Sequence, residues 1–181
     1  INQQSKGQVI INGSVAAESA EVNINYAGKD SLQNGDVLAA KSHLDSEKKF
    51  TLNGTGTQGT QSGIMNLFFS GEGAGMKGNM TAEKSRVTVN ASGNAKLTGN
   101  VSVEDGGVSN VNLSGESLWT GKSALSGTEA ASNVSVKDNS TWKVTADSAV
   151  STLKLSGGTV DLEGGAHQIK IGHLSADGIP G

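Results

Sequence analysis

Cysteine is absent from this chain of 181 residues, proline occurs once, and aromatic residues make up only 3% of it. Without cysteine there is no disulfide scaffold, no thiolate zinc site and no thiol catalysis. No apolar run approaches the ~18 residues of a membrane-spanning helix. Hydrophobic residues amount to 34%, too few for the thick core of an ordinary sandwich or doubly wound domain. A core this lean suits either a disordered chain or a long, thin solenoid.

Charge is scarce and nearly balanced, with 14 Lys and Arg against 17 Asp and Glu and a net charge of −3. Disorder driven by charge repulsion is therefore not expected. An isoelectric point near 5.6 and the lack of a Lys/Arg cluster argue against a nucleic-acid partner. The solenoid is the remaining option, provided that the sequence repeats.

The chain is rich in glycine, with 26 residues, and in a short unit that reads apolar, polar, apolar, then Gly, Asn, Asp or Ser. Alternation of this kind places both apolar side chains on one face of a strand. Val111-Asn112-Leu113 before Ser114-Gly115 is one of many examples. The stops use residue types that tolerate a positive φ. The pattern predicts many short strands joined by tight turns.

These units recur at the spacing of a solenoid. The steps from Val87 to Val111, from Val111 to Val134 and from Val134 to Leu153 are roughly 20 to 24 residues, the range of solenoid repeats. Two or three short strands fit within each step. No amphipathic run of roughly 12 residues lies between the strands, as a βαβ protein would require. We therefore predict an all-β chain folded as a right-handed parallel β-helix.

We expect one continuous solenoid in two parts. Residues 1–110 should form rungs with an irregular insertion near residues 30–49, including a short helix around residues 38–48. Residues 111–181 should form better-ordered C-terminal rungs. The expected core markers of these rungs are Trp119, Val134, Val136, Trp142, Val144, Leu153, Leu155, Val160 and Leu162.

The histidines are the first candidates for chemistry. His167 and His173 are six residues apart, the parity of one face of a straight strand, but Gly172 and the strand end intervene. No HExxH motif or carboxylate cluster accompanies them or His43. Exposed turn histidines are the simpler interpretation, so we predict no metal and no cofactor.

Carboxylates matter because polysaccharide-acting enzymes with a β-helix fold need two or three of them on one exposed sheet. The most prominent acids here lie mostly in predicted turns: Asp105, Asp138, Asp147, Asp161 and Asp177. Asp161 alone lies inside a predicted strand and points outward, and Arg86 is the single arginine. We therefore expect no enzyme and no catalytic residues, with a polysaccharide-acting enzyme as the alternative.

Three further segments allow two interpretations each. Ile64–Phe69 is either an exposed binding patch or a buried strand, and the second is favoured. Trp119 and Trp142 are either sugar-stacking platforms or fillers of a rung. Gly71–Gly75 has the glycine content of a phosphate loop, but no Lys-Ser/Thr follows it, which favours a turn. The residues that bind a ligand remain unassigned.

Three segments carry a more specific pattern in a fixed order. In Leu113–Gly121 a short strand is followed by Trp-Thr-Gly, and in Val134–Thr145 a strand is followed by Asp-Asn and Thr-Trp. Asp147–Leu162 contains Leu-x-Leu, glycines and Val-Asp. Together they resemble the C-terminal part of the passengers of pertactin-like bacterial autotransporters. The resemblance favours Trp119 and Trp142 as rung residues.

The resemblance implies a fragment that is exported through the outer membrane and is displayed on the cell surface or secreted. It would act as a stalk and an adhesin-type surface, with a role in virulence, and would bind a host surface protein or glycan or mediate self-association between cells. In the full-length protein its own outer-membrane β-barrel would be a further partner. The alternative is the stalk of a protease-type autotransporter whose catalytic domain is missing.

Two further expectations come from the resemblance. The C-terminal rungs would act as an autochaperone, because a solenoid folds by propagation from a stable rung to its neighbours. The family usually continues with a Gly-x-Phe strand and capping rungs, whereas this sequence ends at Ile179-Pro180-Gly181. We therefore expect an excised piece whose last rung is uncapped.

Overall fold

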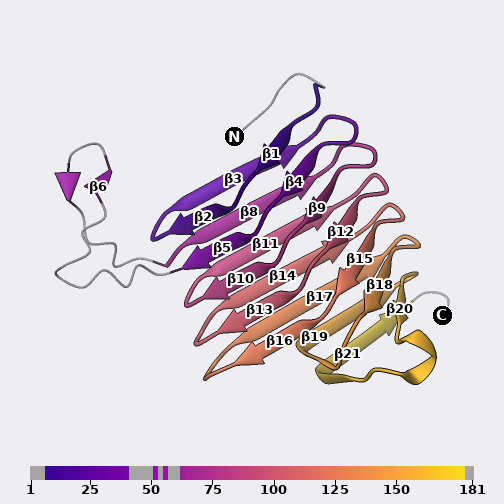
Figure 1. Cartoon of the computed structure of the whole chain (residues 1–181). Coiled ribbons are helices and arrows are strands. Elements are labelled where there is room, and N and C mark those ends of the chain that lie inside the picture. Colours follow the sequence, from indigo (N-terminus) through magenta and orange to yellow (C-terminus); the bar gives the residue numbers. More distant parts are fainter. Residues whose placement is uncertain (1–6, 41–50, 53–54, 57–61, 178–181) are drawn as a thin grey trace.

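The computed structural model describes residues 7–40, 51–52, 55–56 and 62–177. The described chain winds as a solenoid of stacked short strands (Figure 1). Neighbouring strands in its three main sheets are all parallel, and the one helical element among the described residues is a 3-10 turn at Glu163–Gly165. The prediction of an all-β parallel β-helix is confirmed. None of the described helical structure is long and apolar enough to cross a bilayer.

Three sheets form the sides of the solenoid. Sheet A contains β1 (Ile10–Asn12), β4 (Leu32–Asn34), β9 (Gly75–Lys77), β12 (Lys96–Thr98), β15 (Leu118–Gly121), β18 (Thr141–Val144) and β20 (Thr159–Asp161). Sheet B contains β2 (Val15–Glu18), β5 (Val37–Ala40), β10 (Met80–Glu83), β13 (Val101–Glu104) and β16 (Ser123–Ser126). Sheet C contains β3 (Glu21–Tyr26), β8 (Ile64–Phe69), β11 (Arg86–Ala91), β14 (Val108–Leu113), β17 (Ala131–Lys137), β19 (Ser148–Ser156) and β21 (Ile169–Asp177).

The register of the rungs follows the repeat seen in the sequence. Val111 pairs with Val134, and Val134 pairs with Leu153. The first predicted step is wrong by two residues, because Val111 pairs with Val89 and not with Val87. Both valines of β11 point inward, so the apolar pattern alone does not distinguish the two registers.

The corner between sheets A and B is fixed by glycine followed by an Asx residue. A side chain at Gly99, whose φ is +149°, would collide with the Gly78 carbonyl of the rung before. The side chains after the glycines satisfy the amides of the next rung. The Oδ1 of Asn79 accepts from the Asn100 N–H at 2.9 Å, and the Oδ1 of Asn100 accepts from the Lys122 N–H at 3.1 Å.

The core is a narrow column of ladders between the sheets. Of the expected core markers, six are buried: Trp119, Val134, Val136, Trp142, Val144 and Leu153. Three are partly buried against this cluster: Leu155, Val160 and Leu162. Sheet B contributes both small inward residues, such as Ala17, Ala39 and Ala82, and larger ones, such as Met80 and Val101.

Part of the segment expected as an irregular insertion near residues 30–49 belongs to the regular rungs. Residues 32–34 and 37–40 form β4 and β5, which pair in register with the rungs on either side. The expected helix around residues 38–48 therefore overlaps a strand at its start, and residues 41–50 lie outside the described residues. Between β5 and β8 in the sequence, the structure describes the short antiparallel pair β6 (Thr51–Leu52) and β7 (Thr55–Gly56) (Figure 1).

The last two turns lack one side of the solenoid. Sheets A and C are seven-stranded, whereas sheet B is five-stranded and ends at β16. Residues 145–147 lead directly from β18 to β19, and residues 162–168 lead from β20 to β21. Five three-sided rungs are thus followed by two two-sided rungs.

Candidate binding surfaces

A continuous polar row runs along the outer face of sheet C. The equivalent positions on its consecutive strands are Asn23, Asn66, Thr88, Asn110, Asn133, Thr152 and His173. Their side chains bond from rung to rung, as between Asn133 Nδ2 and Asn110 Oδ1 at 3.0 Å and between Thr152 Oγ1 and Asn133 Oδ1 at 2.7 Å. An asparagine amide has two donors and two acceptor lone pairs, so Asn110 and Asn133 have more donors and lone pairs than these bonds use.

A second row lies two residues further along the same strands. It contains Asn25, Phe68, Asn90, Asn112, Ser135, Lys154 and Ser175. The Nδ2 of Asn112 donates to Asn90 Oδ1 at 3.0 Å. Phe68 is the exception, an aromatic ring that is 41% exposed among polar neighbours.

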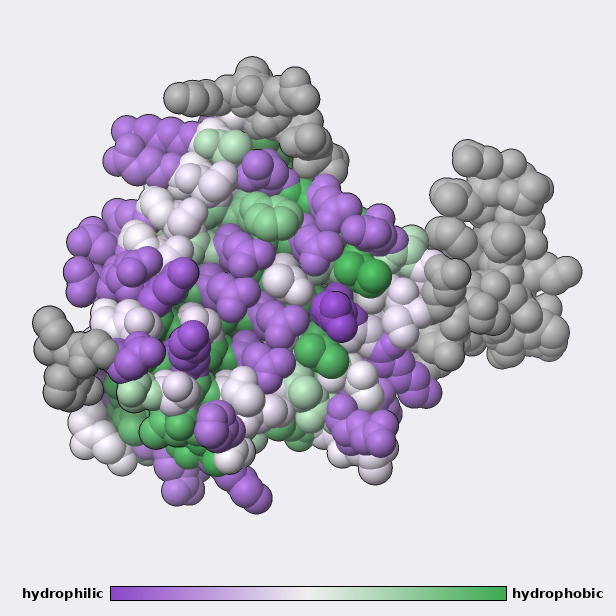
Figure 2. Space-filling model, turned by 180° about the vertical axis from the view of Figure 1, so that it is seen from behind, coloured by the Kyte–Doolittle hydropathy of each residue, from purple (hydrophilic) through white to green (hydrophobic). Residues whose placement is uncertain are grey.

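The two rows make the outer face of sheet C a nearly neutral lattice of donors and acceptors. Strands in a sheet lie ~4.8 Å apart, so the amides repeat at that spacing. Seen from behind, the surface of the molecule is largely hydrophilic with small separate apolar areas, and hydrophobic residues gather toward the C-terminal end (Figure 2). Such a lattice suits a ligand with many hydroxyl or amide groups rather than a strongly charged one.

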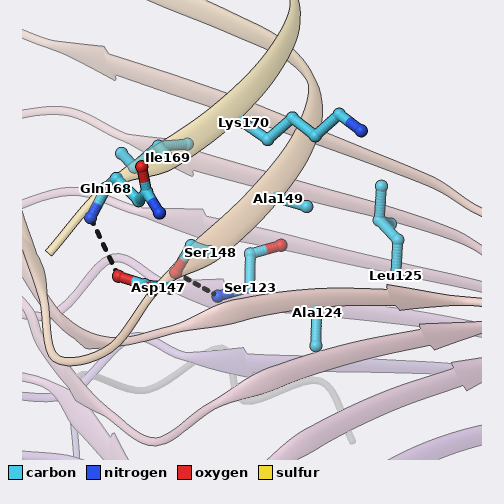
Figure 3. Close-up of a pocket in the computed structure, with 9 residues that line it drawn as sticks. All are labelled: Ser123, Ala124, Leu125, Asp147, Ser148, Ala149, Gln168, Ile169 and Lys170. Carbon is cyan, nitrogen blue, oxygen red and sulfur yellow. Dashed lines mark hydrogen bonds between the residues drawn. The ribbon is translucent and has the colours of Figure 1, made fainter.

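A notch beside the last strand of sheet B is the second candidate. It has a volume of about 620 Å3 and is lined by the starts of three strands, Ser123–Leu125 of β16, residues 147–149 at β19 and residues 168–170 at β21 (Figure 3). The volume lies in the range of ligand pockets. Its lining combines Leu125, Ala149 and Ile169 with the side chain of Lys170.

The structure places His167 in the loop before β21 and His173 within β21. The Nε2 of His167 lies 3.3 Å from Glu163 Oε2, and Lys143 Nζ lies 3.6 Å from the other oxygen of that carboxylate. His173 lies in the polar row on β21, and His43 lies outside the described residues. Within the described ranges, no three His, Asp or Glu side chains are grouped to hold a metal ion.

The acids named from the sequence do not converge. Asp105 and Asp138 are turn residues with positive φ. The Oδ1 of Asp147 accepts from the Gln168 N–H at 3.1 Å, and the Oδ1 of Asp161 accepts from the Glu163 N–H at 2.8 Å. Asp177 ends β21 rather than lying in a turn. The Asp161 contact caps a local turn, and the Asp147 contact joins two successive rungs.

Arg86 is exposed on β11, on the outer face of sheet C, in register with two aliphatic residues. The glycine-rich segment at residues 71–75 forms the turn between β8 and β9 and the first residue of β9. Lys84 lines the same surface hollow as Arg86, so two basic side chains lie near each other there.

The apolar candidates are mostly internal. Met65, Leu67 and Phe69 of β8 are fully buried, which leaves Phe68 as the exposed ring of that strand. Trp119 and Trp142 are fully buried and stack on each other, with ring centroids 4.6 Å apart. Their indole N–H groups donate to the Gly99 and Gly121 carbonyls. Neither indole is available as a sugar platform.

The asparagine rows were not identified from the sequence. The signal was present in the middle of the repeated unit, since Val-Asn-Ile-Asn, Val-Asn-Ala and Val-Asn-Leu place asparagine at the outward position of β3, β11 and β14. Period-two alternation assigns those positions to the outer face, but the register that aligns them required the structure.

Comparisons with known proteins give a limited likeness. No family model matches the chain, and no solved structure matches it. Over 73 residues it is 37% identical to the uncharacterized protein YcgV of Escherichia coli O157:H7. The aligned segment is 40% of this chain and 13% of that protein. The likeness covers too little of either protein to assign a family.

Proposed function

We propose that this chain is part of the passenger of a pertactin-like bacterial autotransporter, exported through the outer membrane to the cell surface or beyond. In this role it is a non-catalytic stalk that also carries an adhesin-type binding surface. The parallel β-helix supports the stalk role, because each rung is bonded to its neighbours along the whole sheet. The pattern of residues 113–162 supports the passenger role, and the likeness to a protein of E. coli agrees with a bacterial source.

The observation that carries the binding role is the asparagine lattice on sheet C. Its amides are held in register by their own hydrogen bonds, so little side-chain entropy would be lost on binding. We propose a glycan or a polar surface of a host protein as the partner, with the same lattice on another cell as the route to self-association. The C-terminal rungs would fold first and template the rungs before them, with the chain's own β-barrel as the membrane partner.

Adhesion tests this proposal with a matched pair of variants. Asn112→Lys with Ser135→Lys places two adjacent charges on the outer face of sheet C, because these residues are register partners. Thr98→Lys with Thr120→Lys places the same charges on the outer face of sheet A. Beads coated with each protein are counted on cultured epithelial cells and on a glycan array. Binding should fall for the sheet C pair only.

Thermal unfolding of both variants shows whether each remains folded. Equal loss from both faces, or full binding by the sheet C pair, would assign adhesion to another surface or to none.

A further inference from the structure

The free edge of β16 presents main-chain groups to the notch. In a parallel sheet each residue directs its N–H and C=O to one neighbouring strand, and consecutive residues alternate between the two neighbours. Val101 of β13 pairs with Ser123 and donates its N–H to the carbonyl of Lys122. Ala124 therefore bonds toward β13, and the N–H and C=O groups of Ser123 and Leu125 face away from it, toward the notch.

One of these main-chain groups forms a hydrogen bond with a side chain where a neighbouring strand would otherwise bond. The Ser123 N–H donates to Ser148 Oγ at 3.2 Å. The N–H and C=O of Leu125 have no hydrogen-bond partner in the described part of the chain. β19 begins beside Ser123 and then rises away from β16, so that the gap widens toward Leu125 (Figure 3). The open part of this edge is thus next to Leu125.

The surroundings of the edge differ on its two faces. The Leu125 side chain points into the gap, where Ala149 and Ile169 also line the notch. Lys170 is exposed and alternates along β21 with Ile169 and Ile171, which pack against the core, so it lies on the outer face. It has no ion-pair partner among residues 7–40 and 62–177. The nearest carboxylate of the lining, Asp147, accepts the Gln168 N–H. The notch therefore has an apolar floor and an uncompensated positive charge.

We propose that this notch binds an extended acidic peptide segment of a partner protein, which adds as a further strand to sheet B beside Leu125. Strand addition supplies affinity through main-chain hydrogen bonds and specificity through alternate side chains. The inward side chains of the segment continue the apolar ladder beyond Leu125, and an outward carboxylate pairs with Lys170. This site is separate from the asparagine lattice, so a negative result here would leave the proposed adhesin role unaffected.

Synthetic peptides test the strand pairing without altering the protein. The probe is a fluorescent hexapeptide of alternating valine and glutamate, acetylated and amidated at its ends, titrated by fluorescence anisotropy. Two matched peptides replace glutamate by lysine or carry N-methyl groups on alternate amides. Each should bind roughly tenfold more weakly than the first peptide. This is the loss expected when one or two hydrogen bonds or an ion pair are removed. Equal binding by all three peptides, or no binding by the first, would overturn the proposal.

Two protein variants locate the site. Leu125→Pro removes an N–H that the β13–β16 pairing does not use, and proline is tolerated on such an edge. Lys170→Glu reverses the charge at the rim, and Lys96→Glu on the outer face of sheet A, where Lys96 is exposed, is its matched control. Leu125→Pro should abolish peptide binding. Lys170→Glu should make the protein bind the lysine peptide more tightly than the acidic peptide. Lys96→Glu should bind like the parent protein.

The melting temperature of each variant reports whether it is folded. If Leu125→Pro unfolds, the N-methylated peptide on the parent protein still decides the question. Unchanged acidic preference in Lys170→Glu would contradict the proposal. Concentration-dependent self-association that disappears in Leu125→Pro, with no peptide binding, would assign the notch to a second copy of the chain and overturn it as well.

Discussion

Leu153 and Leu174 occupy the same ladder position on neighbouring strands, yet they differ in burial. They are register partners on β19 and β21, and Leu153 is 3% exposed whereas Leu174 is 54% exposed. Leu153 has a neighbouring strand on each side, β17 and β21, and Leu174 has a described neighbour on one side only. In this fold burial comes from stacking, and an identical residue in an identical strand position is core or surface according to its neighbours.

The three-sided and two-sided rungs differ in the same way. In the first five rungs, inward residues of sheet B close the core opposite sheets A and C. In the last two rungs that side is missing, and Leu155, Val160 and Leu162 are only partly buried. The Trp119–Trp142 stack joins the two regions, because Trp119 lies in the last three-sided rung and Trp142 in the first two-sided rung.

The largest expected effect is the loss of that stack. Trp142→Ala should lower the free energy of unfolding by roughly 3–5 kcal/mol, because it removes a fully buried indole and leaves a cavity that the neighbouring rungs cannot close. Its hydrogen bond to the Gly121 carbonyl, at 3.0 Å, is lost as well. Urea unfolding followed by far-ultraviolet circular dichroism measures the change.

Trp142→Phe is the control for ring stacking. It keeps an aromatic ring against Trp119 and should lose clearly less stability than the alanine variant. If Trp142→Ala loses less than about half a kcal/mol, the two regions are not held together by the stack.

The paired leucines give the next largest effect and test the stacking argument directly. Leu153→Ala should cost about 2–4 kcal/mol as a core truncation, and Leu174→Ala should stay within about 0.5 kcal/mol, as an exposed residue does. Both values come from the same urea experiment. Equal losses at the two positions would show that Leu174 is covered in solution.

The sequence predicted the strands of sheet C better than those of the other sheets. Sheet C strands have six to nine residues and carry two or three inward apolar side chains each, as in Val111 and Leu113, so their alternation is visible. Strands of sheets A and B have three or four residues in most rungs, and their inward residues include Gln33, Ala39 and Ser123. A single small or polar inward residue carries no detectable period.

The notch and the lattice could not be predicted for different reasons. The missing sheet B strand shortens the repeat, since 23 residues separate Val111 from Val134 and 19 separate Val134 from Leu153. That change was within the scatter expected of solenoid repeats. The lattice requires the outward asparagines to align, and a shift of one residue would send each of them to the opposite face.

A polar pair within the three-sided region gives a smaller effect. The Tyr26 hydroxyl donates to the buried Gln33 Oε1 at 2.7 Å, in a ladder position that is apolar in the later rungs. Tyr26→Phe should cost about 1–3 kcal/mol, because the amide oxygen is left buried without its donor. Stability curves at neutral pH provide the comparison with the parent protein.

The same pair predicts a pH dependence. Burial raises the pKa of the Tyr26 phenol above its ordinary value, so the folded state favours the neutral phenol. This stabilisation is complete below the unfolded pKa of about 10 and is lost as the pH rises above it toward the folded pKa. The advantage of the parent protein over Tyr26→Phe should therefore shrink above pH ~10. A constant difference across that range would contradict the role of burial at Tyr26.

The smallest expected effect on stability lies on the outer face of sheet C. Asn112→Ala removes one partly exposed side-chain bond to Asn90 and should cost about 0.5 kcal/mol. Ser135→Ala, on the next strand and in register, is the control, because its hydroxyl makes no hydrogen bond within the described residues. If the lattice is the adhesive surface, Asn112→Ala should weaken cell binding far more than it weakens folding. If binding falls only in proportion to stability, loss of folding accounts for both measurements. The asparagines would then have a structural role only.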